Sequence, residues 1–112
     1  MKKKFILKKR KEINFIFKFK KNVRNYFFIL YYARNPEFEH FKFALSINKK
    51  YGKSHERNLI KRRLRMIIYN NICLIDKKSS FVLVIKPPAK NLSFNELSEK
   101  FTYLLKKSFL II

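Results

Sequence analysis

The segment from Lys49 to Arg65 constrains this chain most, because it holds eight basic residues and one acid, with apolar residues at helical spacing. Read as a helix from Ser54, it carries a basic stripe made of Arg57, Lys61 and Arg65, flanked by Asn58 and Arg62. A separate apolar face is made of Ile60, Leu64 and Ile67. Such a helix has to bury its apolar face against the rest of the fold. Its basic stripe then presents charges at the regular spacing that suits nucleic-acid phosphates.

The net charge is +21, from 28 lysine and arginine residues against 7 acids. Self-repulsion of this size destabilises a compact chain unless an anionic partner screens it. Nucleic acid and an acidic membrane surface are the classes of partner that fit. Lysine is frequent along the whole chain, so arginine, whose planar fork suits phosphates, is the better marker of a binding surface.

Length and composition predict one folded domain, residues 1–112, with a basic N-terminal tail over residues 1–9. Thirteen phenylalanines and six tyrosines supply area for a core. We expect the one cysteine, Cys73, to be a buried small hydrophobe. The apolar run Phe5-Ile6-Leu7 is shorter than the roughly seven residues of a signal peptide, and no run reaches the ~18 residues of a membrane span, so we expect a cytoplasmic protein.

Hydrophobic periodicity predicts one helix and two strands in the first half of the chain. The expected elements are a short amphipathic helix over 12–19, a covered strand over 26–33 and an alternating strand over 41–48, with a turn at Asn35-Pro36-Glu37. We expect the two strands to be antiparallel through this short loop.

The second half predicts the basic helix, a strand and a last helix. The helix is expected over 54–72 with Ser54 as a possible N-cap, the strand over 81–85, and the last helix after a capping box from Ser93 to Glu96. Gly52, the one glycine, is expected to supply a positive-φ turn that aims the basic helix. The order is αββαβα, and it contains a β-α-β unit whose default crossover is right-handed.

No side chains gather in a pattern typical of catalysis. His40 and His55 stand apart from any Cys, Asp or Glu at ligand or triad spacing. The sequence also lacks a glycine-rich phosphate loop, a pair of carboxylates and a nucleophile motif. A binding protein without catalytic or metal-ligating side chains is expected.

The motif Arg57-Asn58-x-x-Lys61-Arg62-x-x-Arg65, preceded by Ser46-Ile47-Asn48-Lys49-Lys50-Tyr51-Gly52, resembles the signature of the bacterial ribonuclease P protein subunit. The resemblance extends from Leu7 to about Leu110 and includes the order of the elements. It implies an α/β (α+β) two-layer sandwich with a small mixed sheet and packed helices, similar to ribosomal protein S5 domain 2, with a left-handed β-α-β crossover in place of the default.

The resemblance also implies a function and its partners. In this family the catalyst is an RNA that removes the 5′ leader of precursor tRNA with Mg²⁺, which is bound mainly by the RNA and the substrate. The protein assists the binding of substrate and metal. The expected partners are therefore the catalytic RNA and precursor tRNA, with no membrane and no obligate protein partner.

Two sets of site residues follow from the resemblance and from the basic segment. The residues expected to bind RNA are Lys49, Lys50, Lys53, Arg57, Asn58, Lys61, Arg62 and Arg65. The residues that fall where the family forms a cleft for the single-stranded leader are Ile13, Phe17, Tyr31, Ser46 and Asn48.

The chain departs from the family pattern at four places. Leu59 stands where a second arginine is usual, and Arg63 is the neighbouring residue that could compensate. Ile13 replaces an aromatic residue, which leaves Phe17 and Tyr31 to stack on bases. The other two are Lys20, where a glycine commonly ends the first helix, and His55-Glu56, where small or apolar residues are usual.

Two alternatives remain open at this point. A small structural RNA-binding protein of the ribosomal type has the same size, charge and α/β form. A binder of acidic membrane surfaces would use Phe5, Ile6 and Leu7 with the neighbouring lysines.

Overall fold

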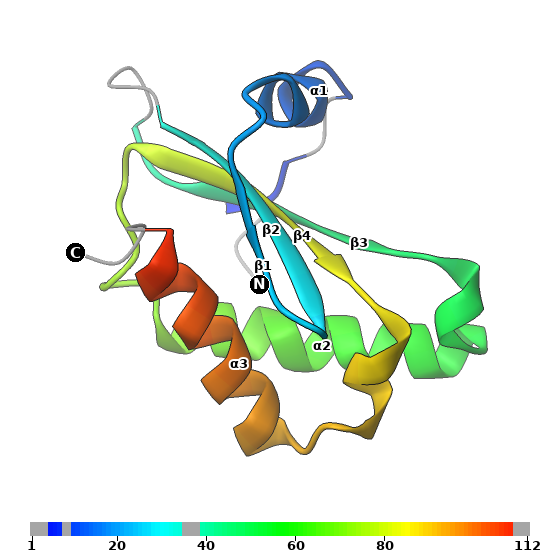
Figure 1. Ribbon diagram of the computed structural model, residues 1–112. Coiled ribbons are helices and arrows are strands. Elements are labelled where there is room, and N and C mark those ends of the chain that lie inside the picture. Colours follow the sequence, from blue (N-terminus) through cyan, green and yellow to red (C-terminus); the bar gives the residue numbers. More distant parts are fainter. Residues whose placement is uncertain (1–4, 8–9, 35–38, 109–112) are drawn as a thin grey trace.

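The computed structural model describes residues 5–7, 10–34 and 39–108. The elements are α1 (Arg10–Lys18), β1 (Asn22–Arg24), β2 (Phe28–Arg34), β3 (Lys42–Ile47), η2 (Lys49–Tyr51), α2 (Ser54–Asn70), β4 (Ser79–Ile85), η3 (Pro87–Asn91) and α3 (Phe94–Lys107). The four strands form one sheet in the order β1-β2-β4-β3. Helices α2 and α3 cover one face of this sheet, and α1 crosses the other face (Figure 1).

Strands β3 and β4 are parallel neighbours, and α2 is the crossover between them, which confirms the expected β-α-β unit. β2 is antiparallel to β4. The two predicted strands run antiparallel to each other as expected, because β3 is parallel to β4 and β2 is antiparallel to it, and β4 lies between them in the sheet. The hand of the crossover stays the prediction that the resemblance made.

The main core lies between the sheet and α2 with α3. The apolar face of α2 is buried there, as its spacing predicted, with Ile68 added to Ile60, Leu64 and Ile67. Four aromatic rings extend the core from the sheet to α3. Phe41, Phe43 and Phe81 lie nearly parallel, and Phe81 meets Phe101 at 6.1 Å between ring centroids. These rings supply much of the area that a domain of this size has to bury.

A smaller apolar cluster holds α1 on the other face of the sheet. Ile16 is 1 % exposed and packs with Leu7, Ala33 and Val82. Leu7 belongs to the segment expected to be a basic tail, yet its backbone N–H donates to the Phe43 carbonyl. The described part of that segment is therefore docked along the edge of β3.

Three local predictions need correction. β1 was not foreseen, because a three-residue strand of mixed polarity carries no periodic signal. The N-cap of α2 is Lys53, and Ser54 is the first helical residue. Cys73 is exposed, because α2 ends at Asn70 and leaves the cysteine in the turn that follows. The turn expected at Asn35-Pro36-Glu37 lies outside the described residues.

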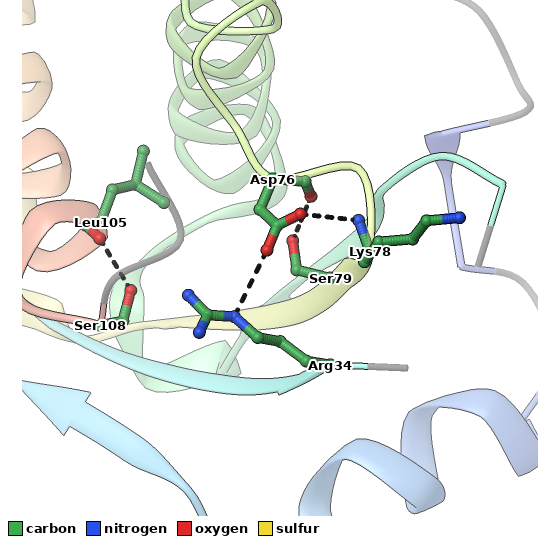
Figure 2. Close-up of polar contacts among 6 residues, drawn as sticks. All are labelled: Arg34, Asp76, Lys78, Ser79, Leu105 and Ser108. Carbon is green, nitrogen blue, oxygen red and sulfur yellow. Dashed lines mark hydrogen bonds and ion pairs between the residues drawn. The ribbon is translucent and has the colours of Figure 1, made fainter. Parts of the chain in front are cut away.

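Asp76 organises the connection from α2 into β4 (Figure 2). Its carboxylate accepts a hydrogen bond from the Lys78 backbone N–H at 2.9 Å and pairs with Arg34 at the end of β2. Its carbonyl accepts the Ser79 hydroxyl at 2.6 Å. These contacts fix where β4 begins, and β4 is an inner strand that pairs with both β2 and β3.

Candidate RNA-binding surfaces

The basic helix begins at a tightly built corner. Gly52 follows η2 with φ 158° and ψ −163°, a combination that is essentially restricted to glycine. A Cβ at Gly52 would also lie 2.8 Å from Oε1 of Glu56. The expected positive-φ turn before the helix is therefore present, and it leaves room for the carboxylate of Glu56.

Besides reducing the positive charge of the helix, Glu56 connects the first turn of α2 to the segments around it. Its carboxylate accepts the Lys53 backbone N–H at 3.0 Å, which caps the helix, and it pairs with the ammonium of Lys90 in η3. The hydrogen bond from Lys90 holds the pKa of Glu56 below its ordinary value, and the Lys53 N–H lowers that pKa further. The acid thus ties the first turn of α2 to the segment after β4.

The basic stripe of α2 lies beside the buried face, as its spacing predicted. Asn58, Arg62 and Arg65 are exposed, whereas Arg57 and Lys61 are partly buried. The guanidinium of Arg57 donates from Nη2 to the Ser54 hydroxyl at 3.0 Å, which orients it along the helix surface. The residues Lys49, Lys50 and Lys53 are exposed on η2 and just before α2, so they continue the same basic surface.

Arg63 lies one turn after the exposed Leu59, on the same flank of α2. It is partly buried, and it is close enough to the buried Tyr51 to act on that side chain. Burial raises the pKa of the Tyr51 hydroxyl, Glu56 raises it further, and the charge of Arg63 opposes both. Arg63 is therefore a basic residue on the same flank as Leu59 and near Tyr51 of η2.

An aromatic pair lies where α1 meets the sheet. Phe17 of α1 and Tyr31 of β2 pack edge to face at 4.8 Å between ring centroids, and Phe17 stays 38 % exposed. Ser46 is exposed on β3, and the side-chain oxygen of Asn48 accepts the Lys50 N–H and so caps η2. Ile13 is partly buried and packs against the apolar cluster under α1.

The sheet adds two residues to this surface that were not predicted. Ile29 pairs with Val84, and Val84 pairs with Ser46, so the three form one row across β2, β4 and β3. Ile29 and Val84 are both partly exposed. The partial exposure of Val84 could not be predicted, because the run from Phe81 to Ile85 is uniformly apolar and this strand was expected to be fully buried. We call Phe17, Tyr31, Ile29, Val84 and Ser46 the open sheet surface.

The basic surface of α2 and η2 supplies positive charge, and the open sheet surface supplies aromatic rings. Proteins bind nucleic acid with both kinds of group. Among residues 5–7, 10–34 and 39–108, no group of three or more His, Cys, Asp or Glu side chains is placed to hold a metal ion. None of the helices in this described part is long and apolar enough to cross a membrane. These features define a small nucleic-acid-binding α/β protein.

Comparison with known proteins narrows that class. The family model described as Ribonuclease P matches residues 1–108. The ribonuclease P protein component of Onion yellows phytoplasma is 52% identical over 112 residues, which are 100% of this chain and 79% of that protein. The counterpart from Acholeplasma laidlawii is 41% identical over 99% of this chain and 95% of its own length. The chain belongs to the ribonuclease P protein family.

Solved structures agree with this assignment. A mutant ribonuclease P protein of Staphylococcus aureus superposes with a TM-score of 0.91 at 26% identity, covering 97% of this chain and 92% of that one. The ribonuclease P protein of Thermotoga maritima gives a TM-score of 0.81 at 27% identity, covering 90% and 94%. The chain is the protein component of a ribonucleoprotein endoribonuclease that acts in tRNA processing.

Proposed function

We propose that this chain binds the catalytic RNA of ribonuclease P through the basic surface of α2 and η2, and the 5′ leader of precursor tRNA through the open sheet surface. The observation that carries the proposal is the basic stripe of α2, held at a fixed angle by a buried apolar face and a capped first turn. A rigid row of cations suits the backbone of a folded RNA, whose phosphates are fixed in space.

The leader is assigned to the other surface because single strands need a different chemistry. Unstacked bases bind to aromatic rings and apolar floors, and Phe17, Tyr31, Ile29 and Val84 supply both. The buried positions of Phe5 and Leu7 count against the membrane-surface alternative, since these side chains pack inside the described fold.

Magnesium is assigned to the RNA and the substrate. Mg²⁺ needs several oxygen ligands, and the carboxylates of Glu12, Glu56 and Asp76 each already pair with a lysine or arginine. These ion pairs engage the three carboxylates, which supports placing Mg²⁺ on the RNA and the substrate. What the chain contributes is position and positive charge, which let the RNA reach the same affinity for its substrate with less free metal.

Reconstitution tests the proposal. The purified chain is combined with its cognate catalytic RNA at low Mg²⁺, and cleavage of precursor tRNA is followed together with substrate affinity. We expect both to rise above those of the RNA alone. A chain that binds RNA yet leaves both quantities unchanged would refute the proposed role.

A further inference from the structure

The register of the sheet continues the row of the open sheet surface to its far edge. Arg24 of β1 pairs with Ile29, and the row then runs through Val84 to Ser46. Directly paired residues in a sheet carry their side chains on the same face. The row therefore crosses all four strands, with a polar residue at each end and two apolar residues between them.

The α1 helix leaves this row uncovered. Its apolar side chains pack in the cluster that includes Tyr31, Val82 and Ala44, which form the neighbouring row. Ile29 and Val84 belong to neither of the two core clusters of the described residues, and both are partly exposed. An apolar strip beside a helix, with an arginine at its end, is thus presented to solvent.

The charge around Arg24 is positive. Arg24 is exposed on an edge strand, and its Nη2 donates to Oδ1 of Asn22 at 3.3 Å. The ammonium of Lys86 donates to the Asn25 carbonyl at 3.0 Å, which brings a second cation to the turn after β1. None of the four strands contains an aspartate or a glutamate. The long, exposed contact with Asn22 leaves most of the guanidinium donors of Arg24 to an anion.

We propose that Arg24 binds a phosphate of the single-stranded leader. The leader would reach Arg24 by following the row of sheet residues from Ser46 on β3 to β1. The proposal rests on the proposed function, because it extends the leader-binding surface by one strand. Four strands span three steps of about 4.8 Å, so Arg24 lies about 14 Å from Ser46. Only a leader long enough to cross that distance reaches Arg24.

The test is leader length. Arg24→Ala and Arg24→Lys are assembled with the cognate catalytic RNA, and the Kd is measured for precursors with a one-nucleotide leader and with progressively longer leaders. We expect Arg24→Ala to weaken binding of long-leader precursors about tenfold and to leave the shortest precursor unchanged. Arg24→Lys should recover part of the loss, since it keeps the charge without the planar fork.

Arg10→Ala, at the exposed start of α1, is the matched control and should behave as the parent. Urea unfolding of each variant shows that the fold is kept. Equal weakening for all leader lengths, or parent-like binding of long leaders by Arg24→Ala, would overturn the assignment of Arg24. If the parent chain itself gives no preference for long leaders, the proposed function fails, and this outcome is distinct from a failure of Arg24 alone.

Discussion

Lys20 adopts a backbone conformation that is unfavourable for a residue with a Cβ. It follows α1 with φ 57°, in the left-handed region that a residue with a Cβ adopts at a cost of about 1–2 kcal/mol. The glycine that the family resemblance implies at this position would adopt this conformation without that cost. Lys20 is exposed, so the cost is conformational and not due to packing.

Replacing Lys20 by glycine should therefore stabilise the fold. We expect Lys20→Gly to raise the free energy of unfolding by about 1 kcal/mol, because the strain is removed and only part of that gain is lost to the greater freedom of the unfolded chain. Urea unfolding followed by circular dichroism measures the change. Asn14→Gly, at an exposed position in the middle of α1, is the control and should lose about 0.5 kcal/mol. A loss in both variants would show that Lys20 is not strained.

The protonation of Glu56 makes the stability of the fold depend on pH. Its pKa in the folded chain lies below the ordinary value of about 4.3, so folding is favoured fully above that value, and this contribution is lost as the pH falls through the lowered pKa. We expect Glu56→Gln to lower the stability at neutral pH and to flatten its fall in acid. Thermal unfolding from pH 7 to pH 3 measures both. Glu99→Gln, at an exposed position of α3, should keep the parent profile, and an equal flattening there would contradict the role of Glu56.

Single residues also show what could and could not be predicted from the sequence alone. Roles for Arg57 and Phe17 could be proposed from the sequence because spacing and the family resemblance bear on them directly. Glu56 could only be counted as one charge, since its partner Lys90 comes from a segment 34 residues away and no local rule joins the two. Cys73 was misplaced because the end of a helix is decided by packing over a stretch where periodicity fades.

Among the elements, α2 is the one whose role is most open to measurement. Each phosphate contact that is lost should reduce the salt slope of RNA binding by about one unit. We expect Arg65→Ala to lower the affinity for the catalytic RNA and to flatten the plot of log K against log salt accordingly. Lys61→Ala and Lys107→Ala form a matched pair of helical lysines, of which only the first should act this way. Identical slopes for the pair would contradict a localised surface.

The α1 helix and the sheet contribute the second surface. Phe17→Ala removes an exposed ring that packs on Tyr31, and we expect it to weaken binding of precursors with leaders about tenfold while sparing mature tRNA. Phe15→Ala, an equally exposed ring of the same helix, is the control. Binding of both RNAs by the parent and variant holoenzymes gives the comparison. Equal losses for the two RNAs would show that Phe17 serves only to pack α1.

The sequence predicted which segments form helices and which form strands. It did not predict which strands pair with each other in the sheet. The alternation from Phe41 to Asn48 identifies a strand without naming its partner. The order β1-β2-β4-β3 depends on the packing of α2, which brings β4 between two strands that are consecutive in the expected order. β1 exists only by pairing with β2, so no local pattern could reveal it. The row from Arg24 to Ser46 depends on this order and was therefore invisible in the sequence.

The two proposed binding surfaces lie on opposite sides of one sheet. Helix α2 lies under the face that carries the main core, and α1 crosses the other face (Figure 1). β3 and η2 join the two faces, because the strand that carries Ser46 leads directly into the basic residues before α2. The net charge of +21 explains why such a chain is expected to work as part of a complex with RNA.

We propose that the chain adds recognition of the leader to an RNA enzyme. The Kd for precursor tRNA and for mature tRNA is measured with the catalytic RNA alone and with the holoenzyme, at one fixed salt and Mg²⁺ concentration. We predict that the chain strengthens binding of the precursor far more than binding of mature tRNA, so that the ratio of the two Kd values rises. A ratio that stays the same, with both affinities raised equally, would show that the chain does not recognise the leader.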